Sequence, residues 1–179
     1  MTGYVRDRRG LTVVELVIAV AIVAVLVTAM IPGLGLWLSH HRIKGVAGDV
    51  ASCIRLAQMM AVETNQTCRV EFDSGAGIVR VFDGGGVATR TITLAESDAQ
   101  FDNAEGGGNG LDFIDHAPVD GLINVSFNSR GIPRDEQSSP LTPPGGQDGQ
   151  RVFLENSRGE GYWVEVTPVG NVRYDKYKG

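Results

Sequence analysis

A single acidic residue lies inside the most apolar stretch of this sequence. Leu11 to Ile31 contains 21 residues, and Glu15 is the only charged one. A run of that length can cross the hydrocarbon core of a bilayer as a helix. Because a carboxylate in lipid is costly without a partner, its presence there indicates a function. The alternative is that Glu15 extends back to the nearby interface.

A short basic segment precedes the apolar run. Arg6, Arg8 and Arg9 come just before Gly10 and favour a cytoplasmic N-terminus, although basic residues beyond the run weaken that bias. An ordinary signal anchor or a cleaved secretory peptide is the alternative. A secretory peptide needs a small-residue cleavage site after a shorter apolar core, and residues 29–31 fit that requirement poorly.

Gly10, Leu11, Glu15 and Pro32 together resemble the class III signal of type IV pilins and type II secretion pseudopilins. That family usually has Phe where this chain has Leu11. The resemblance implies that a prepilin peptidase cuts between Gly10 and Leu11 and methylates the new amine of Leu11. It also implies that Glu15 serves subunit assembly by pairing with the N-terminal amine of a neighbouring subunit, and that Pro32 kinks the helix.

The same resemblance divides the chain into three parts. Residues 1–10 form a leader peptide, residues 11–38 a transmembrane and assembly helix, and residues 39–179 a periplasmic domain of helix and strands. Its implied location is the bacterial inner membrane, crossed once, with the C-terminal domain in the periplasm and the filament tip reached after assembly.

Two cysteines, Cys53 and Cys68, invite a disulfide in an oxidising periplasm. If the helix ends near Thr64, Cys53 lies about 16 Å before that end. A strand that returns antiparallel carries Cys68 back by about 13 Å. The sequence therefore predicts a Cys53–Cys68 disulfide, and the alternative is two separate buried thiols.

The C-terminal tail interleaves Arg173, Lys176 and Lys178 with aromatic residues, a composition suited to phosphate pairing and base stacking. Residues 170–173 resemble the Gly-Arg-x-Arg motif of DNA-binding FimT-type minor pilins, except that Asn171 replaces the first Arg. Residues 39–179 carry 13 basic and 19 acidic residues, a net charge of −6, which does not favour a nucleic acid partner. The alternative is an edge strand with solubilising charges.

We expect no metal, cofactor or enzymatic activity. Four acidic residues between positions 98 and 115 could offer oxygen ligands to calcium, but their spacing matches no calcium loop, so a solvated loop is expected; they are Asp98, Asp102, Asp112 and Asp115. His40 and His41 point about 100° apart on a helix and cannot share a metal as a helical pair would. No serine, cysteine or histidine has a plausible base nearby.

The elements that position these residues follow from periodicity. Beyond the apolar run, apolar residues recur at spacings of three and four, at Ile43, Val46, Ala47, Val50, Ile54, Ala57 and Ala61. They predict one helix of about 50 residues that ends at Thr64-Asn65-Gln66, with a soft stretch at 32–36 caused by Pro32 and glycines. Alternating segments then predict antiparallel strands at 68–72, 78–82, 89–94, 123–127, 152–154, 162–166 and 171–174. Residues 84–86 are expected to connect a hairpin, and residues 95–121 and 133–149 to form loops.

This order of elements, and the segment 127–131, resemble the GspH/FimT family. The implied fold class is α+β and pilin-like, with a long N-terminal helix packed on antiparallel sheets. The implied function is a minor type IV pilin that primes or caps pilus assembly. A minor pseudopilin of a type II secretion system and a DNA-binding minor pilin for competence are the alternatives. The implied partners are other minor and major pilins or pseudopilins, prepilin peptidase and inner-membrane lipid.

Overall fold

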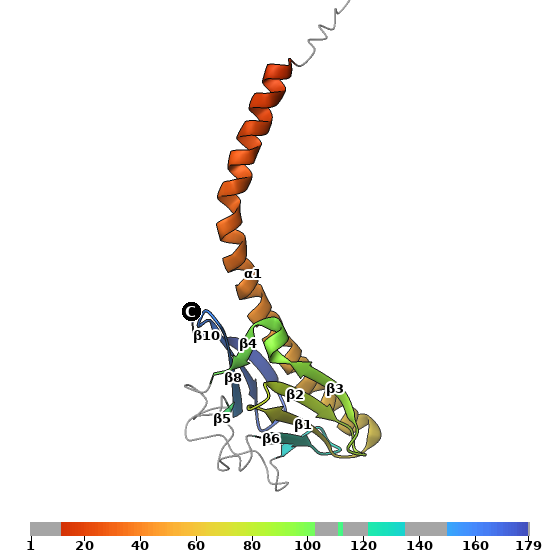
Figure 1. The fold of residues 1–179 in the computed structure, drawn as a ribbon. Helices are drawn as coiled ribbons and strands as arrows, with labels where there is room; N and C mark the ends of the chain where they lie inside the picture. Colours follow the sequence, from red (N-terminus) through yellow and green to blue (C-terminus); the bar gives the residue numbers. More distant parts are fainter. Residues whose placement is uncertain (1–11, 103–110, 113–121, 135–149, 179) are drawn as a thin grey trace, which may run out of the picture. The chain divides into compact units, whose positions relative to one another are not determined.

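The computed structural model describes residues 12–102, 111–112, 122–134 and 150–178 (Figure 1). The side chains of residues 29–36, 111, 112, 122 and 178 lie outside this description, although their backbone is included. The chain divides into two compact units, Met1–Leu38 and Ser39–Gly179.

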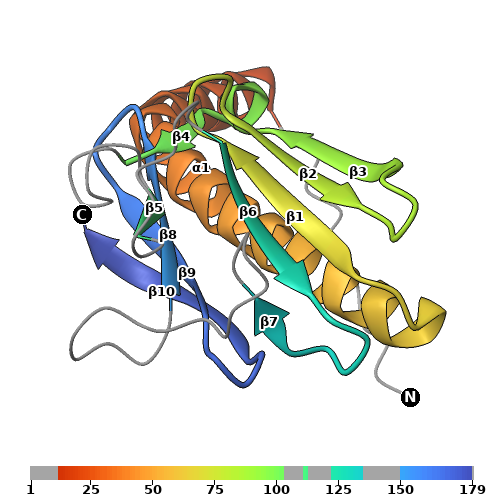
Figure 2. The same ribbon diagram turned by 90° about the horizontal axis from the view of Figure 1, so that it is seen from below.

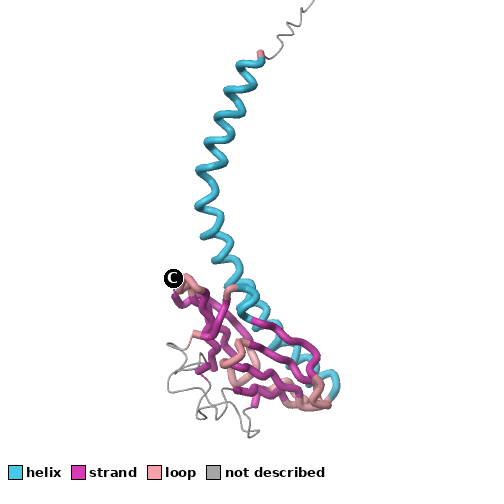
Figure 3. The backbone as a smooth tube through the Cα atoms, in the orientation of Figure 1, coloured by secondary structure: helices cyan, strands magenta, loops and turns pink. Residues whose placement is uncertain are grey.

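Helix α1 (Val13–Thr64) is a single helix of 52 residues, drawn in cyan in Figure 3. Its length confirms the predicted helix of about 50 residues. The backbone stays helical through Pro32, while the predicted kink and soft stretch at 32–36 lie outside the described side chains. The helix ends where Asn65 adopts a left-handed φ of 53°, a conformation that Asn tolerates better than most residues.

Ten strands and one short 3₁₀ helix follow α1 in the described residues. The first sheet is antiparallel in the order β3-β2-β1-β6-β7. It consists of β1 (Cys68–Asp73), β2 (Ile78–Phe82), β3 (Ala88–Thr93), β6 (Leu122–Phe127) and β7 (Pro133–Arg134). As predicted, the β2–β3 connection through residues 84–86 is a hairpin.

The second sheet is also antiparallel, in the order β10-β9-β8-β4, with β5 pairing to β8. It consists of β4 (Ala99–Phe101), β5 (Leu111–Asp112), β8 (Gln150–Asn156), β9 (Gly161–Val166) and β10 (Val172–Lys178). The loop prediction for 95–121 is wrong at the 3₁₀ helix η1 (Leu94–Ser97), β4 and β5. Strands of two or three residues are too short for alternation to be seen in the sequence.

The core of the second unit lies between α1 and the two sheets. In Figure 2 the orange and yellow half of α1 lies behind β1 and β6, with β8, β9 and β10 alongside. All seven residues of the predicted helical stripe are buried there. They pack with Phe72 and Phe127 of the first sheet and with Leu154 and Val164 of the second. This arrangement confirms the α+β, pilin-like fold class.

The predicted disulfide is absent, because Cys53 and Cys68 are both free and fully buried. Residues 65–67 form the turn after the helix, and β1 begins only at Cys68. Cys68 therefore lies near the helix end, close to Thr64, Asp83 and Gly84. Cys53 lies 11 residues before Thr64, or about 16 Å along the helix axis. The prediction treated the turn residues as if they already belonged to the returning strand.

Candidate functional site

The N-terminal end of α1 holds the charged group that the sequence singled out. The hydroxyl of Thr12 accepts a hydrogen bond from the backbone N–H of Glu15, at 3.2 Å. The Thr12 carbonyl accepts another from the N–H of Leu16, at 3.1 Å. Thr12 is therefore the N-cap of the helix, and Glu15 is in its first turn, where a negative charge complements the helix dipole.

Thr12 is a structural residue, the helix cap, that the sequence analysis missed. Thr followed three residues later by Glu is the spacing of a capping box, in which each residue supports the helix start. The signal was readable in the sequence but was overshadowed by the apolar run that follows. The predicted cleavage and methylation residues, Gly10 and Leu11, lie outside the described residues.

The first turns of α1, on both sides of Glu15, present apolar side chains around the whole circumference of the helix. Each of eleven large apolar residues between 13 and 27 is more than half exposed, and they are Val13, Val14, Leu16, Val17, Ile18, Val20, Ile22, Val23, Val25, Leu26 and Val27. One side also forms a shallow apolar groove lined by Ile18, Ala21, Ile22, Val25 and Leu26. A helix that is apolar all round is typically buried in lipid or in a large assembly.

A helix that crosses a bilayer must be both long enough and apolar enough. Within the described part of the chain, no helix satisfies both requirements. The predicted span, Leu11–Ile31, extends past the described side chains at both ends, since residue 11 and residues 29–36 are outside them.

The predicted DNA-contact residues have different environments. The guanidinium of Arg173 is bonded to the fully buried carboxylate of Glu165, which also accepts a bond from Arg151 Nε at 3.0 Å. Both guanidinium groups lie over the ring of Trp163, at 4.9 Å for Arg151 and 5.8 Å for Arg173. Arg173 is thus part of an ion-pair ladder across β8, β9 and β10.

Of the other two cations of the tail, only the Lys176 side chain belongs to the described structure. Lys176 is exposed, and the Lys178 side chain lies outside the description. The ladder itself could not be read from the sequence, because its members come from three strands. Only the two-residue spacing of Trp163 and Glu165 on β9 indicates that they share a face.

His40 anchors the start of the globular unit. Its Nδ1 lies 3.4 Å from a Glu160 carboxylate oxygen, and its Nε2 lies 3.5 Å from the Tyr162 hydroxyl. Asn156 donates to both Ser39 Oγ and Glu160, at 3.1 and 2.9 Å. These contacts fasten the helix to the β8–β9 turn. Burial raises the pKa of Tyr162.

Metal-binding chemistry finds no support in the described residues. They contain no group of three His, Cys, Asp or Glu side chains arranged to hold a metal ion. Asp98 is one of the four acidic residues named as calcium candidates. Its carboxylate accepts a hydrogen bond from Ser157 Oγ at 3.0 Å. Asp115 lies outside the described residues.

Known proteins resemble this chain at its N-terminus and in its fold. A family model described as the prokaryotic N-terminal methylation motif matches residues 5–31. Among solved structures, the minor pseudopilin EpsH from the type 2 secretion system of Vibrio cholerae matches with a TM-score of 0.51 and 14% identity. The match covers 75% of this chain and 97% of that one. No curated protein matches the chain in sequence.

The motif and the fold together support assignment to the type IV pilin and pseudopilin superfamily. The motif covers the predicted cleavage residues and Glu15, while the structural likeness covers most of the chain. At 14% identity the likeness to EpsH concerns the fold alone. Proteins of this superfamily are structural subunits rather than enzymes, and the methylation motif suggests assembly from a membrane-anchored state.

Proposed function

We propose that this protein is a minor type IV pilin, a structural subunit that primes or caps pilus assembly at the bacterial inner membrane. The observation that carries the proposal is the N-terminal part of α1, which is apolar on every side and has Glu15 as its only charge. Such a helix needs an apolar surrounding, first lipid and then neighbouring subunits. Before assembly, the C-terminal domain faces the periplasm; afterwards the subunit lies at the filament tip.

In the proposed assembly, Glu15 sets the axial position of one subunit's helix relative to the next. A carboxylate withdrawn from water is costly unless a cation and hydrogen-bond donors satisfy it. The methylated amine of Leu11 on a neighbouring subunit, created by prepilin peptidase, is the cation that we propose. Because the pairing is favourable only when both groups are buried together, it selects one axial position of one helix against the next.

A second candidate function is a minor pseudopilin of a type II secretion system. The likeness to EpsH favours it, because that protein is named as a minor pseudopilin of such a system. Both candidates use the same N-terminal helix and the same assembly chemistry. The filament that contains the protein in its own cell discriminates between them, since one is a surface pilus and the other a periplasmic pseudopilus.

The experiment that tests the assembly role replaces Glu15 by Gln. Gln has the size of Glu and also serves in a capping box, so Glu15→Gln removes the charge and little else. We expect the variant to remain in the inner membrane and to disappear from purified filaments, as measured by immunoblotting of both fractions.

Thr12→Ala is the matched control, because it removes the helix cap and retains the carboxylate. Loss of a cap costs about 1 kcal/mol of helix stability, which a 52-residue helix tolerates. We expect filament levels close to those of the wild type. Native incorporation of Glu15→Gln, or equal loss of both variants, would contradict the charge-pairing role.

A further inference from the structure

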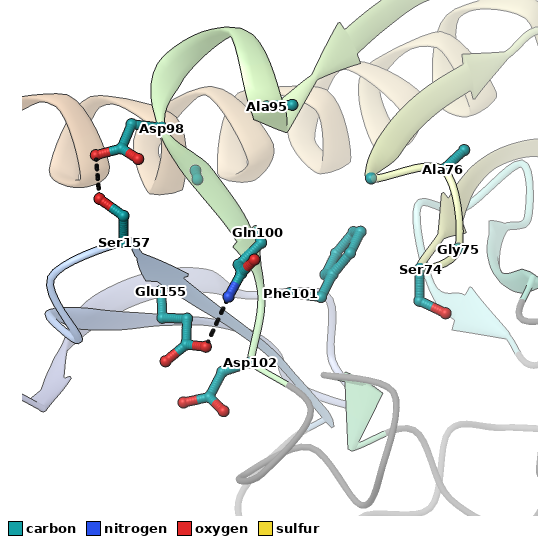
Figure 4. Close-up of a pocket in the computed structure, with 12 residues that line it drawn as sticks. Ser74, Gly75, Ala76, Ala95, Asp98, Gln100, Phe101, Asp102, Glu155 and Ser157 are labelled. Atoms are coloured by element: carbon teal, nitrogen blue, oxygen red, sulfur yellow. Dashed lines mark hydrogen bonds between the residues drawn. The ribbon is translucent and has the colours of Figure 1, made fainter.

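Strand β4 forms one edge of the second sheet, and a cleft of about 690 Å³ opens beside it. Figure 4 shows this cleft between β4 and the β1–β2 turn, with Phe101 on one side and Ser74 to Ala76 on the other. In the part of the chain that the structure describes, no strand pairs with this edge of β4. The cleft therefore lies along an unextended sheet edge.

The backbone of β4 is oriented to accept another strand. Asp102 N donates to Phe153 O at 2.9 Å, and the register pairs Gln100 with Glu155. In an antiparallel pair, the residues bonded to one neighbour alternate with residues whose N–H and C=O point the opposite way. The backbone N–H and C=O groups of Gln100 and Asp102 thus point to β8. The backbone groups of Ala99 and Phe101 consequently point to the cleft side.

The β1–β2 turn, which lies opposite β4 across the cleft, has small side chains and a hydrogen-bonded backbone. Gly75, Ala76 and Gly77 form the turn, and small side chains leave room for an added backbone. The N–H of Ala76 is held by Asp73 Oδ1 at 2.8 Å, and Gly77 O accepts from the N–H of Leu94 at 2.9 Å. A wall that is already ordered loses little conformational freedom when a ligand binds.

The cleft is acidic. Its lining includes Asp98 and Glu155, which are accessible to solvent, and Asp102, which is buried, and none of the twelve described residues that line it is basic. Neutral groups donate to these carboxylates: Ser157 Oγ to Asp98 at 3.0 Å, Tyr177 Oη to Asp102 at 2.6 Å and Gln100 Nε2 to Glu155 at 3.0 Å. Such a surface complements Lys or Arg side chains.

We propose that this cleft binds an extended, basic segment of another polypeptide chain, which adds to β4 as an extra antiparallel or parallel strand. Main-chain bonds to Ala99 and Phe101 supply part of the affinity, and Lys or Arg side chains next to the carboxylates supply the selectivity. Because β4 has only three residues, about 10 Å of strand is available, which pairs about three residues of the added segment. The inference goes beyond the proposed function, which uses only the N-terminal helix.

The test uses the full-length chain in detergent micelles and the fluorescent peptide Lys-Val-Lys-Val-Lys, with binding followed by fluorescence polarisation. Ala76→Trp places a large ring in the cleft at an exposed turn position. Val169→Trp, at a residue that is 74% exposed and outside the cleft, is the matched control. A second peptide carries N-methyl groups on alternate backbone nitrogens, so that it keeps its charge but cannot pair on one edge.

We expect the plain peptide to bind with a Kd below about 1 mM, and Ala76→Trp to weaken binding at least about tenfold while Val169→Trp does not. We also expect the N-methylated peptide to bind at least about tenfold more weakly. Three results would overturn the proposal: no binding of the plain peptide, equal binding of the N-methylated peptide, or equal effects of the two Trp variants. Equal binding of the N-methylated peptide would show that charge attraction alone explains the binding and that no strand is added to β4.

Discussion

The buried thiols illustrate how strongly the position of one residue decides its chemistry. Cys53 is fully buried, and burial raises its pKa from 9.0 to about 11, with smaller and opposed contributions from Arg90 and Asp49. Burial also raises the pKa of Cys68. Since the thiolate is the reactive form of cysteine, both residues are inert in the folded protein near neutral pH.

Thiol titration tests this account. We predict that the folded chain reacts slowly with an alkylating reagent at pH 7, and that unreduced, denatured protein shows two free thiols. A raised thiol pKa also means that the folded state loses stability as pH rises from 9.0, the ordinary value, towards the value of about 11 for Cys53. If denatured protein shows no free thiol before reduction, the Cys53–Cys68 disulfide exists, and the free cysteines of the structure are contradicted.

Among the elements, one helix side chain, Gln58, bridges a turn of the first sheet and a turn of the second. Gln58 Nε2 donates to Gly131 O at 2.9 Å and to Gly170 O at 3.2 Å, which belong to the β6–β7 and β9–β10 turns. Both glycines have positive φ, of 72° and 88°. A Cβ on Gly170 would lie 2.9 Å from Gly131 O, so the two turns approach too closely for a larger residue there.

We predict that Gln58→Ala lowers the free energy of unfolding by about 1–3 kcal/mol, because two carbonyl groups lose their donor. Met59→Ala is the control on the adjacent residue, which is 60% exposed, and its effect is expected to stay within about 0.5 kcal/mol. The measurement is chemical denaturation followed by circular dichroism. Equal effects of the two substitutions would show that the bridge between the turns is unimportant for stability.

Long, periodic elements were predictable from the sequence, and the contacts between distant elements were not. The helical stripe from Ile43 to Ala61 and the β1–β2 hairpin follow from local spacing alone. By contrast, β4 and β5 depend on pairing with β8, whose partner residues are 39 to 57 positions away along the chain. The partners of Gln58 and Glu165 are likewise brought together only by the tertiary fold. The cap at Thr12 had a local signal that could have been used.

At the scale of the whole molecule, charge argues against nucleic acid as a partner. Residues 39–179 have a net charge of −6, and Arg173 is already paired with Glu165. Three phosphate contacts by the tail would give a salt slope of only about −2 to −3. We predict no micromolar binding of duplex DNA by the full chain near about 150 mM salt. A polarisation titration that finds such binding, and loses it in Arg173→Ala, would support the DNA-binding alternative instead.

The central claim is that this chain is matured as a pilin-type subunit before it assembles, and the mass of its N-terminus tests that claim most directly. We predict that protein from membranes of its own cell begins at a methylated Leu11. In the Gly10→Val variant, the peptidase cannot approach the backbone, so the precursor remains about 1.2 kDa heavier. Intact-mass spectrometry of both proteins is the measurement. An unmethylated wild-type chain that retains residues 1–10, or normal cleavage of Gly10→Val, would contradict the claim.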